Sequence, residues 1–97
     1  MNRPHNNYNM EKYHRFESWL KKNNYDTWKT YLGYMKQIEK DLGGIDLEKI
    51  NSTTYLKKLR TELQGKNVFI SRGESDKSNI LSGFKTYIDF VSETAKN

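Results

Sequence analysis

Apolar side chains recur every three or four residues in four stretches of the chain. This spacing places them on one side of a helix, because an α-helix has 3.6 residues per turn. The pattern predicts helices over residues 10–23, 26–43, 53–64 and 77–94. It also predicts a single helical turn over residues 46–50 and a loop over residues 66–76, attached to the core by its apolar middle. A short hairpin in that loop is the less favoured alternative.

Residues that commonly begin and end helices stand at the borders of these stretches. A short polar side chain before a helix accepts a hydrogen bond from a free N–H group of the first turn. Gly43 and Gly44 offer the left-handed backbone at which helices commonly stop. The expected N-caps are Asp26, Ser52 and either Ser75 or Asp76.

The helices are expected to form one domain. Helices with one apolar stripe each bury those stripes only against one another, so we expect a compact all-α bundle of four helices, with or without a short fifth turn. The chain has 97 residues, which is room for a single domain. Residues 1–9 show no periodicity and are expected to form a flexible N-terminal arm, while the helical domain covers residues 10–94.

Composition narrows the class of partner. The chain carries 17 Lys and Arg against 12 Asp and Glu, a formal charge of +5, which favours an anionic partner. It contains no cysteine, which excludes disulfides and thiolate metal sites. No apolar stretch has the length of a membrane span, and the first residues lack the apolar run of a secretory signal. We therefore expect a cytoplasmic protein with no membrane partner.

The polar side of the helix over residues 26–43 carries only basic and uncharged residues. At 100° per residue, Glu39 and Asp41 fall outside the arc opposite the apolar stripe. A solvated helix surface usually mixes both signs of charge, so this segregation suggests an anionic partner, although three lysines can also share a face by chance. We call this surface the basic arc, and its members are Lys29, Thr30, Gly33, Lys36, Gln37 and Lys40.

The last predicted helix offers a second polar face suited to nucleic acid. Its acids, Asp89 and Glu93, come only in the second half. Serine, asparagine and lysine contact phosphate oxygens or base edges, and asparagine pairs with adenine in a major groove. An ordinary solvated helix surface is the plainer interpretation. The residues concerned are Lys77, Ser78, Asn79, Ser82, Lys85 and Thr86.

Two glycines interrupt predicted helices. Gly33 and Gly83 both lie away from the apolar stripes, and glycine costs a helix about 1 kcal/mol relative to alanine. Each therefore needs a compensating reason. Close approach of another helix is one reason, and at Gly33 the approach of a phosphate or a base edge is an equally good one.

Catalytic patterns are missing from the sequence. His5 and His14 are separated by nine positions and have no acid or cysteine at metal-ligand spacing. The P-loop, GxGxxG and GxSxG signatures do not occur, and residues 71–74 lack the glycines and the Lys-Ser/Thr pair of a phosphate-binding loop. We expect no enzyme activity, no catalytic residue, no cofactor and no metal.

Three stretches together resemble the N-terminal core-binding, SAM-like domain of tyrosine recombinases and phage integrases. They read FESWL at residues 16–20, DTWKTYL at residues 26–32 and KSNILSGFKTYIDFV at residues 77–91. The family pattern is a helix ending in FxxWL, a capped helix with a T…Y pair, and a last helix with LSxxKxYxxFx. The resemblance covers about residues 10–93, and its motifs are mainly amphipathic-helix patterns with aromatic anchors.

The resemblance implies an orthogonal bundle of four or five helices whose second and last helices cross a DNA major groove. The family's larger catalytic domain, with its arginine, histidine and tyrosine residues, has no room in this chain. Strand cleavage is therefore not implied, and a targeting domain or a small free-standing DNA-binding protein is. The contacting positions that the resemblance implies are Lys29, Thr30, Gly33, Lys36, Lys40, Ser78, Asn79, Ser82 and Lys85.

Two functional hypotheses follow. The first is a non-catalytic module that binds duplex DNA, alone or with a fused or partner catalytic domain. The alternative is a helical protein-interaction module, such as a small phage or mobile-element protein that docks on an acidic surface of a nucleic-acid enzyme, with Tyr25 and Tyr34 as anchors. Weaker candidates for extra phosphate contacts are Lys57, Lys58, Arg60, Lys66 and Arg72.

Overall fold

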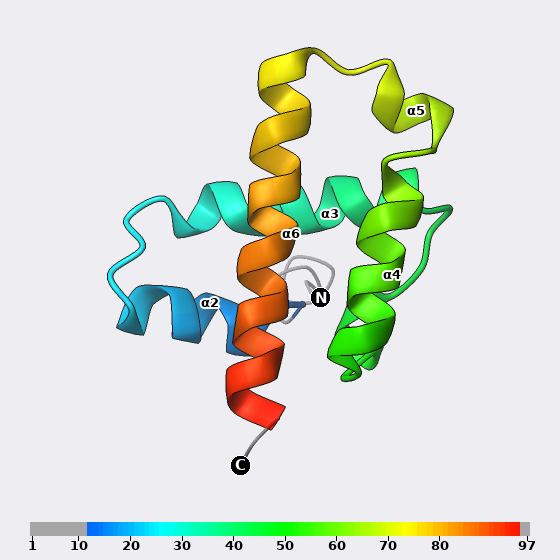
Figure 1. The fold of residues 1–97 in the computed structure, drawn as a ribbon. Helices are drawn as coiled ribbons and strands as arrows, with labels where there is room; N and C mark the ends of the chain where they lie inside the picture. The colour runs from blue at the N-terminus through cyan, green and yellow to red at the C-terminus, as the bar shows by residue number, and fades with distance from the viewer. Residues whose placement is uncertain (1–11, 96–97) are drawn as a thin grey trace, which may run out of the picture.

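A computed structural model describes residues 12–95 of the chain (Figure 1). Within that range the chain forms five α-helices, one 3-10 helix and no strand, which confirms the predicted all-α bundle. The predicted arm over residues 1–9 and the predicted start of the first helix at Met10 lie outside the described residues. The elements are α2 (His14–Lys22), α3 (Trp28–Asp41), the 3-10 helix η1 (Leu47–Lys49), α4 (Thr53–Leu63), α5 (Asn67–Ile70) and α6 (Glu74–Ala95).

The first described helix begins at His14, so the prediction of a helix running through Tyr13 is wrong. The φ angle of Tyr13 is 63°, in the left-handed region, and a right-handed helix does not continue through such a residue. The turn lets the Tyr13 ring enter the core, where the residue is buried. It packs edge-on against Tyr87, with ring centroids 5.6 Å apart.

Helix borders follow the predicted capping chemistry at some positions and depart from it at others. The Ser52 hydroxyl accepts the N–H of Tyr55 at 3.2 Å, as predicted. Asp26 does not cap α3, because the N-cap position is Thr27, which makes no side-chain capping hydrogen bond. Gly43 and Gly44 end the α3 segment, with φ angles of 90° and 91° that other residues rarely adopt.

The segment over residues 66–76 is partly helical where a loop was predicted. Residues Asn67–Ile70 form α5, and α6 begins at Glu74 rather than at residue 77. The expected caps, Ser75 and Asp76, are therefore inside α6. Acidic side chains at Glu74 and Asp76 favour a helix start, because they complement the partial positive charge of its N-terminal end. The short hairpin is excluded in this segment.

The apolar middle of that segment is only partly attached to the core. Phe69 is buried, while Val68 and Ile70 are 52% and 49% exposed. A helical turn points neighbouring side chains in different directions, so one of three consecutive apolar residues faces inward.

The helices bury one side each in a shared core. In Figure 1, α6 crosses α3, and α2 and α4 lie on either side of the second half of α6. The packing of α3 against α6 is the most extensive in the bundle. Aromatic rings fill the space between α2 and α6, where the Phe16 ring centroid lies 4.9 Å from Tyr87 and 5.2 Å from Phe90.

The two helical glycines have different environments. A Cβ atom built on Gly83 would lie 2.7 Å from Cδ2 and 3.1 Å from Cβ of Tyr34, so Gly83 is what allows α3 and α6 to approach closely. A Cβ atom on Gly33 would meet nothing within 4 Å. Helix packing therefore explains Gly83 and does not explain Gly33.

We expect the two glycines to respond in opposite directions to replacement by alanine. Gly83→Ala should lower the free energy of unfolding by about 1–3 kcal/mol, because the new methyl group overlaps the Tyr34 ring at Cδ2 and lies tightly against its Cβ atom. Gly33→Ala should raise it by about 0.5–1 kcal/mol, because alanine has the higher helix propensity and space is open there. Urea unfolding followed by circular dichroism measures both changes, and equal effects at the two positions would contradict this account of the crossing.

Candidate nucleic-acid interface

Every member of the basic arc is exposed on α3. Going round the helix from Lys36, the arc passes Lys40 and Gly33 and ends at Thr30, next to the side that faces α6. Lys29, Lys36 and Lys40 form no ion pair with any residue from 12 to 95. The arc is therefore a continuous surface with three uncompensated positive charges.

The first of the two acids of α3 is neutralised at one edge of the arc. The ammonium of Lys12 lies 3.0 Å from Glu39 and 3.2 Å from Asp46. Glu39 also accepts hydrogen bonds from the Tyr13 hydroxyl and, at 3.0 Å, from the N–H of Leu47. Burial lowers the pKa of Lys12, but its bonds to the two carboxylates outweigh this effect and raise the pKa.

The second acid of α3 is neutralised at the other edge. Asp41 is buried, and its carboxylate accepts two hydrogen bonds from the Arg72 guanidinium, at 2.9 Å from Nε and 3.0 Å from Nη2. Arg72 also donates to Gln37 at 2.8 Å and to Asp76 at 3.3 Å. The bond to Asp41 raises the pKa of Arg72. Arg72 thus joins the start of α6 to the end of α3.

The structure brings three of the predicted site residues together where α3 meets α6. Thr30 from α3 and Asn79 and Ser82 from α6 line one hollow of about 220 Å³. No acid lines it. We call this hollow the α3–α6 corner, and its lining is Thr27, Thr30, Tyr31, Tyr34, Asn79 and Ser82.

Other predicted residues of α6 lie outside the corner. Lys77 and Ser78 line a second hollow, beside Phe69 and Ile70 of the α5 region, and Lys77 pairs with Glu74 at 3.1 Å. Lys85 is exposed but has Asp89 at 3.5 Å. Sequence reasoning missed these pairings, because it placed Glu74 in a loop and took Asp89 to matter only for the second half of the helix.

The five weaker candidates for phosphate contacts divide into two groups. Arg72 is engaged by Asp41, and Arg60 donates to the Leu81 carbonyl at 3.2 Å. These two arginines bind groups of the bundle itself. Lys57, Lys58 and Lys66 are exposed.

Sequence reasoning missed one surface at the edge of the basic arc. Trp28 was assigned to the apolar stripe, yet it is only half-buried. The ammonium of Lys21, from the end of α2, lies 4.2 Å from its ring centroid, and that of Lys29 lies 5.5 Å away. The available signal was the Lys21-Lys22 pair, which precedes the short connection between the two helices.

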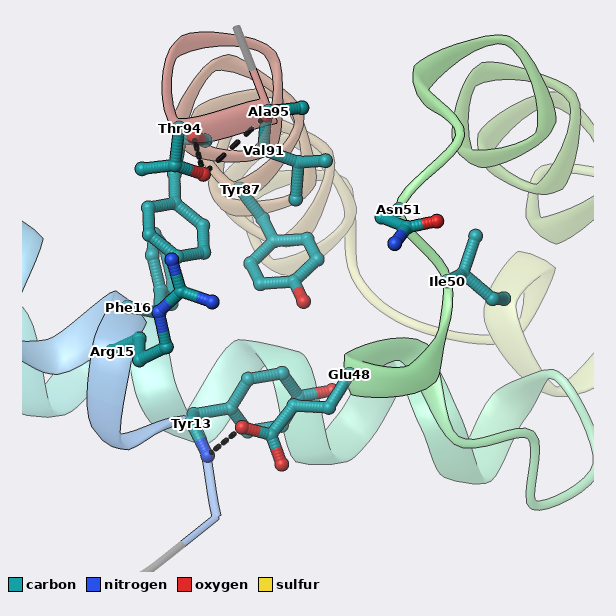
Figure 2. A pocket seen from close by; sticks show the side chains of 11 residues that line it. Tyr13, Arg15, Phe16, Glu48, Ile50, Asn51, Tyr87, Val91, Thr94 and Ala95 are labelled. Carbon is teal, nitrogen blue, oxygen red and sulfur yellow. Dashed lines mark hydrogen bonds between the residues drawn. The ribbon is translucent and has the colours of Figure 1, made fainter. Parts of the chain in front are cut away.

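A separate cavity of about 430 Å³ lies between the start of α2, η1 and the last turns of α6 (Figure 2). The rings of Tyr13 and Tyr87 line it, and the N–H of Tyr13 donates to Glu48 at 2.6 Å. Burial raises the pKa of the Tyr13 phenol, helped by its hydrogen bond to Glu39, and burial with the nearby carboxylates raises the pKa of Tyr87. None of the predicted DNA-binding residues lines this cavity.

No family model matches the chain, and neither a curated protein nor a solved structure matches it. The resemblance to recombinase core-binding domains therefore stays a prediction that depends on the residues quoted for it. Between residues 12 and 95, none of the helices is both long enough and apolar enough to pass through a bilayer. The same part of the chain contains no group of three His, Cys, Asp or Glu placed to hold a metal ion.

Removal of the Arg72 side-chain charge should destabilise the bundle strongly. Arg72→Met leaves the Asp41 carboxylate buried without a partner, so we expect the free energy of unfolding to fall by about 3–5 kcal/mol. The double variant with Asp41→Asn should recover part of this loss, because the uncompensated charge is then gone. Urea unfolding of the two variants tests the interaction, and a double variant that is less stable than Arg72→Met alone would contradict it.

Stability should also fall at alkaline pH. Tyrosines of the unfolded chain ionise near pH 10, whereas the fold keeps Tyr13 and Tyr87 protonated because their pKa values are raised. Their contribution to the free energy of unfolding is therefore complete below pH 10 and is lost as the pH rises above it. Each group contributes a slope of about 1.4 kcal/mol per pH unit. Tyr13→Phe should reduce the slope measured between pH 10 and 11.5, and an unchanged slope would show that Tyr13 is not the group responsible.

Proposed function

We propose that the chain is a non-catalytic DNA-binding module that contacts duplex DNA through the basic arc of α3 and the polar face of α6. The proposal depends on one observation, the neutralisation of both acids of α3 by residues outside the helix. Glu39 and Asp41 are held at the two edges of the arc by Lys12 and Arg72. The lysines between those edges are left exposed without compensating charges.

The basic arc and the corner have complementary roles in this proposal. Lysines on the arc bind phosphate oxygens, and the release of counterions from DNA provides affinity without sequence preference. A Cβ atom on Gly33 would meet nothing within 4 Å, so this position leaves room for a phosphate to approach the α3 backbone. The uncharged corner adjoins the arc at Thr30, so that a duplex bound on the arc is close to Asn79 and Ser82.

The resemblance to core-binding domains supports the same two helices. Both the residue pattern and the resemblance assign DNA contacts to the helices that the structure shows to cross, α3 and α6. We therefore propose that the module directs a catalytic domain, fused or separate, to DNA, or acts as a free-standing protein of a phage or another mobile element.

A second candidate function is a helical protein-interaction module. Its predicted anchors, Tyr25 and Tyr34, are only half-exposed, and both make edge-on ring contacts with Tyr31. The observation that favours this function is instead the exposure of Val68 and Ile70 on α5. Size-exclusion chromatography with and without duplex DNA compares the two functions, because oligomers that do not respond to DNA would favour the interaction module.

Binding to a 30-bp duplex should weaken steeply with salt. If five lysines, including Lys77 and Lys85, each contacted a phosphate, the logarithm of the binding constant would fall against the logarithm of the salt concentration with a slope of roughly −4 to −5, at about 0.9 per phosphate contact. Because Lys77 and Lys85 already pair with acids, we expect about −3 from the three lysines of the arc. Fluorescence anisotropy at several salt concentrations measures the slope, and no saturable binding at low salt would refute the proposed function.

The position of the charges should matter more than their number. Lys36→Glu with Lys40→Glu should abolish measurable duplex binding and leave the helical circular dichroism signal unchanged. The matched control is Lys22→Glu with Lys49→Glu, which makes the same charge change on exposed positions of α2 and η1 that are not predicted to contact DNA. Equal loss of binding in the two double variants would show that only net charge, and not the basic arc, determines affinity.

A further inference from the structure

The α3–α6 corner differs from the basic arc in having no charged residue in its lining. Hydroxyl groups come from Thr27, Thr30 and Ser82, and a carboxamide comes from Asn79. In the part of the chain between residues 12 and 95, the side chains of Thr30, Asn79 and Ser82 make no hydrogen bond. By contrast, the hydroxyl of Thr86 on the same helix donates a hydrogen bond to the Ser82 carbonyl at 3.1 Å. The corner therefore presents unpaired donors and acceptors to the outside.

The wall of the corner is fixed before any ligand arrives. Tyr34 is held against the backbone of α6 at Gly83, and the Tyr31 ring meets Tyr34 edge-on at 6.0 Å between centroids. Asn79 precedes Gly83 by one helical turn, so its position relative to Tyr34 depends on the same crossing. A preformed wall of this kind loses little conformational entropy on binding.

The size and position of the corner indicate what fits there. Its volume of about 220 Å³ is below the roughly 300–1,000 Å³ of pockets that enclose a small molecule, and it suits the edge of a larger ligand. Figure 1 shows that the first half of α6 extends past α3. Asn79 and Ser82 in this half are exposed while Ile80 is buried, so one side of it faces outward. A projecting helix half is able to enter a major groove about 12 Å wide.

We propose that the corner reads an A·T base pair in the major groove. The Asn79 carboxamide pairs with N6 and N7 of adenine, and the C5-methyl group of thymine packs against the Thr30 methyl group and the Tyr31 and Tyr34 rings. A G·C pair presents no methyl group and the wrong set of donors and acceptors for asparagine. This inference rests on the proposed function and adds a specificity that the basic arc does not provide.

The first test selects sites from a pool of duplexes with a randomised centre and then replaces each thymine of the selected site singly by deoxyuridine. We expect an A·T position in the selected motif, and an approximately fourfold loss of affinity at one thymine when its methyl group is removed. Asn79→Ala should lower affinity for the selected site by about fivefold or more and should abolish the preference for A·T at that position. Its salt slope on an unselected duplex should stay unchanged.

Two further variants separate base reading from a general loss of structure. Thr30→Ser keeps the hydroxyl group and removes the methyl group, so it should reduce the loss of affinity caused by the deoxyuridine replacement, while the contacts with the Tyr31 and Tyr34 rings remain. Ser75→Ala is the matched control, because Ser75 is exposed on the same helix and belongs neither to its predicted polar face nor to the lining of the corner. It should leave both the motif and the thymine dependence intact.

The outcomes distinguish this inference from the proposed function. Saturable, salt-dependent binding without a selected motif, or a motif that Asn79→Ala retains, would overturn the reading of an A·T pair and leave DNA binding in place. A motif with no sensitivity to deoxyuridine would also overturn it. If the wild-type chain binds no duplex at low salt, the proposed function fails, and the inference fails with it.

Discussion

The close approach of α3 and α6 is the constraint on which the rest of the bundle depends. Gly83 has no side chain, and the Tyr34 ring occupies the space where one would be. Because this crossing is tight, the relative position of the two helices is fixed at one point and is then secured at a second by Arg72. The polar faces that flank the crossing are held in place as a consequence, and α2 and α4 pack on the apolar sides that remain.

The charge pattern of α3 results from the same arrangement. In the sequence, both acids are direct neighbours of Lys40, and Glu39 is three positions from Lys36. In the structure they face other elements: Glu39 contacts the turn before α2 and the start of η1, and Asp41 contacts the connection before α6. Secondary structure alone puts the acids off the arc, but only tertiary contacts neutralise them. The basic arc is thus a product of the fold as much as of the helix.

Local patterns predicted the helical segments and the bundle because periodicity and capping act over a few residues. They failed where contacts between residues far apart in the sequence determine the backbone conformation or the start of a helix. The left-handed Tyr13 is stabilised by packing against Tyr87, seventy-four positions later in the chain, and the early start of α6 accompanies an ion pair between Arg72 and α3. For the site, helix geometry identified the arc and three residues of the corner, Thr30, Asn79 and Ser82. It gave no indication that Lys77 and Ser78 belong to a separate hollow, because that depends on where α5 packs.

The two neutralising residues come from opposite directions along the chain, Lys12 from before α3 and Arg72 from after it. When the tertiary contacts melt, Glu39 and Asp41 are released next to Lys36 and Lys40, and the surface becomes a mixed one with little attraction for a polyanion. Only the native state then offers the acid-free basic surface on which the proposed DNA binding depends. A polyanion that binds only this state adds RT ln(1 + [L]/Kd) to the free energy of unfolding. The fraction of protein bound to the polyanion and the thermal stability of the protein are therefore thermodynamically linked.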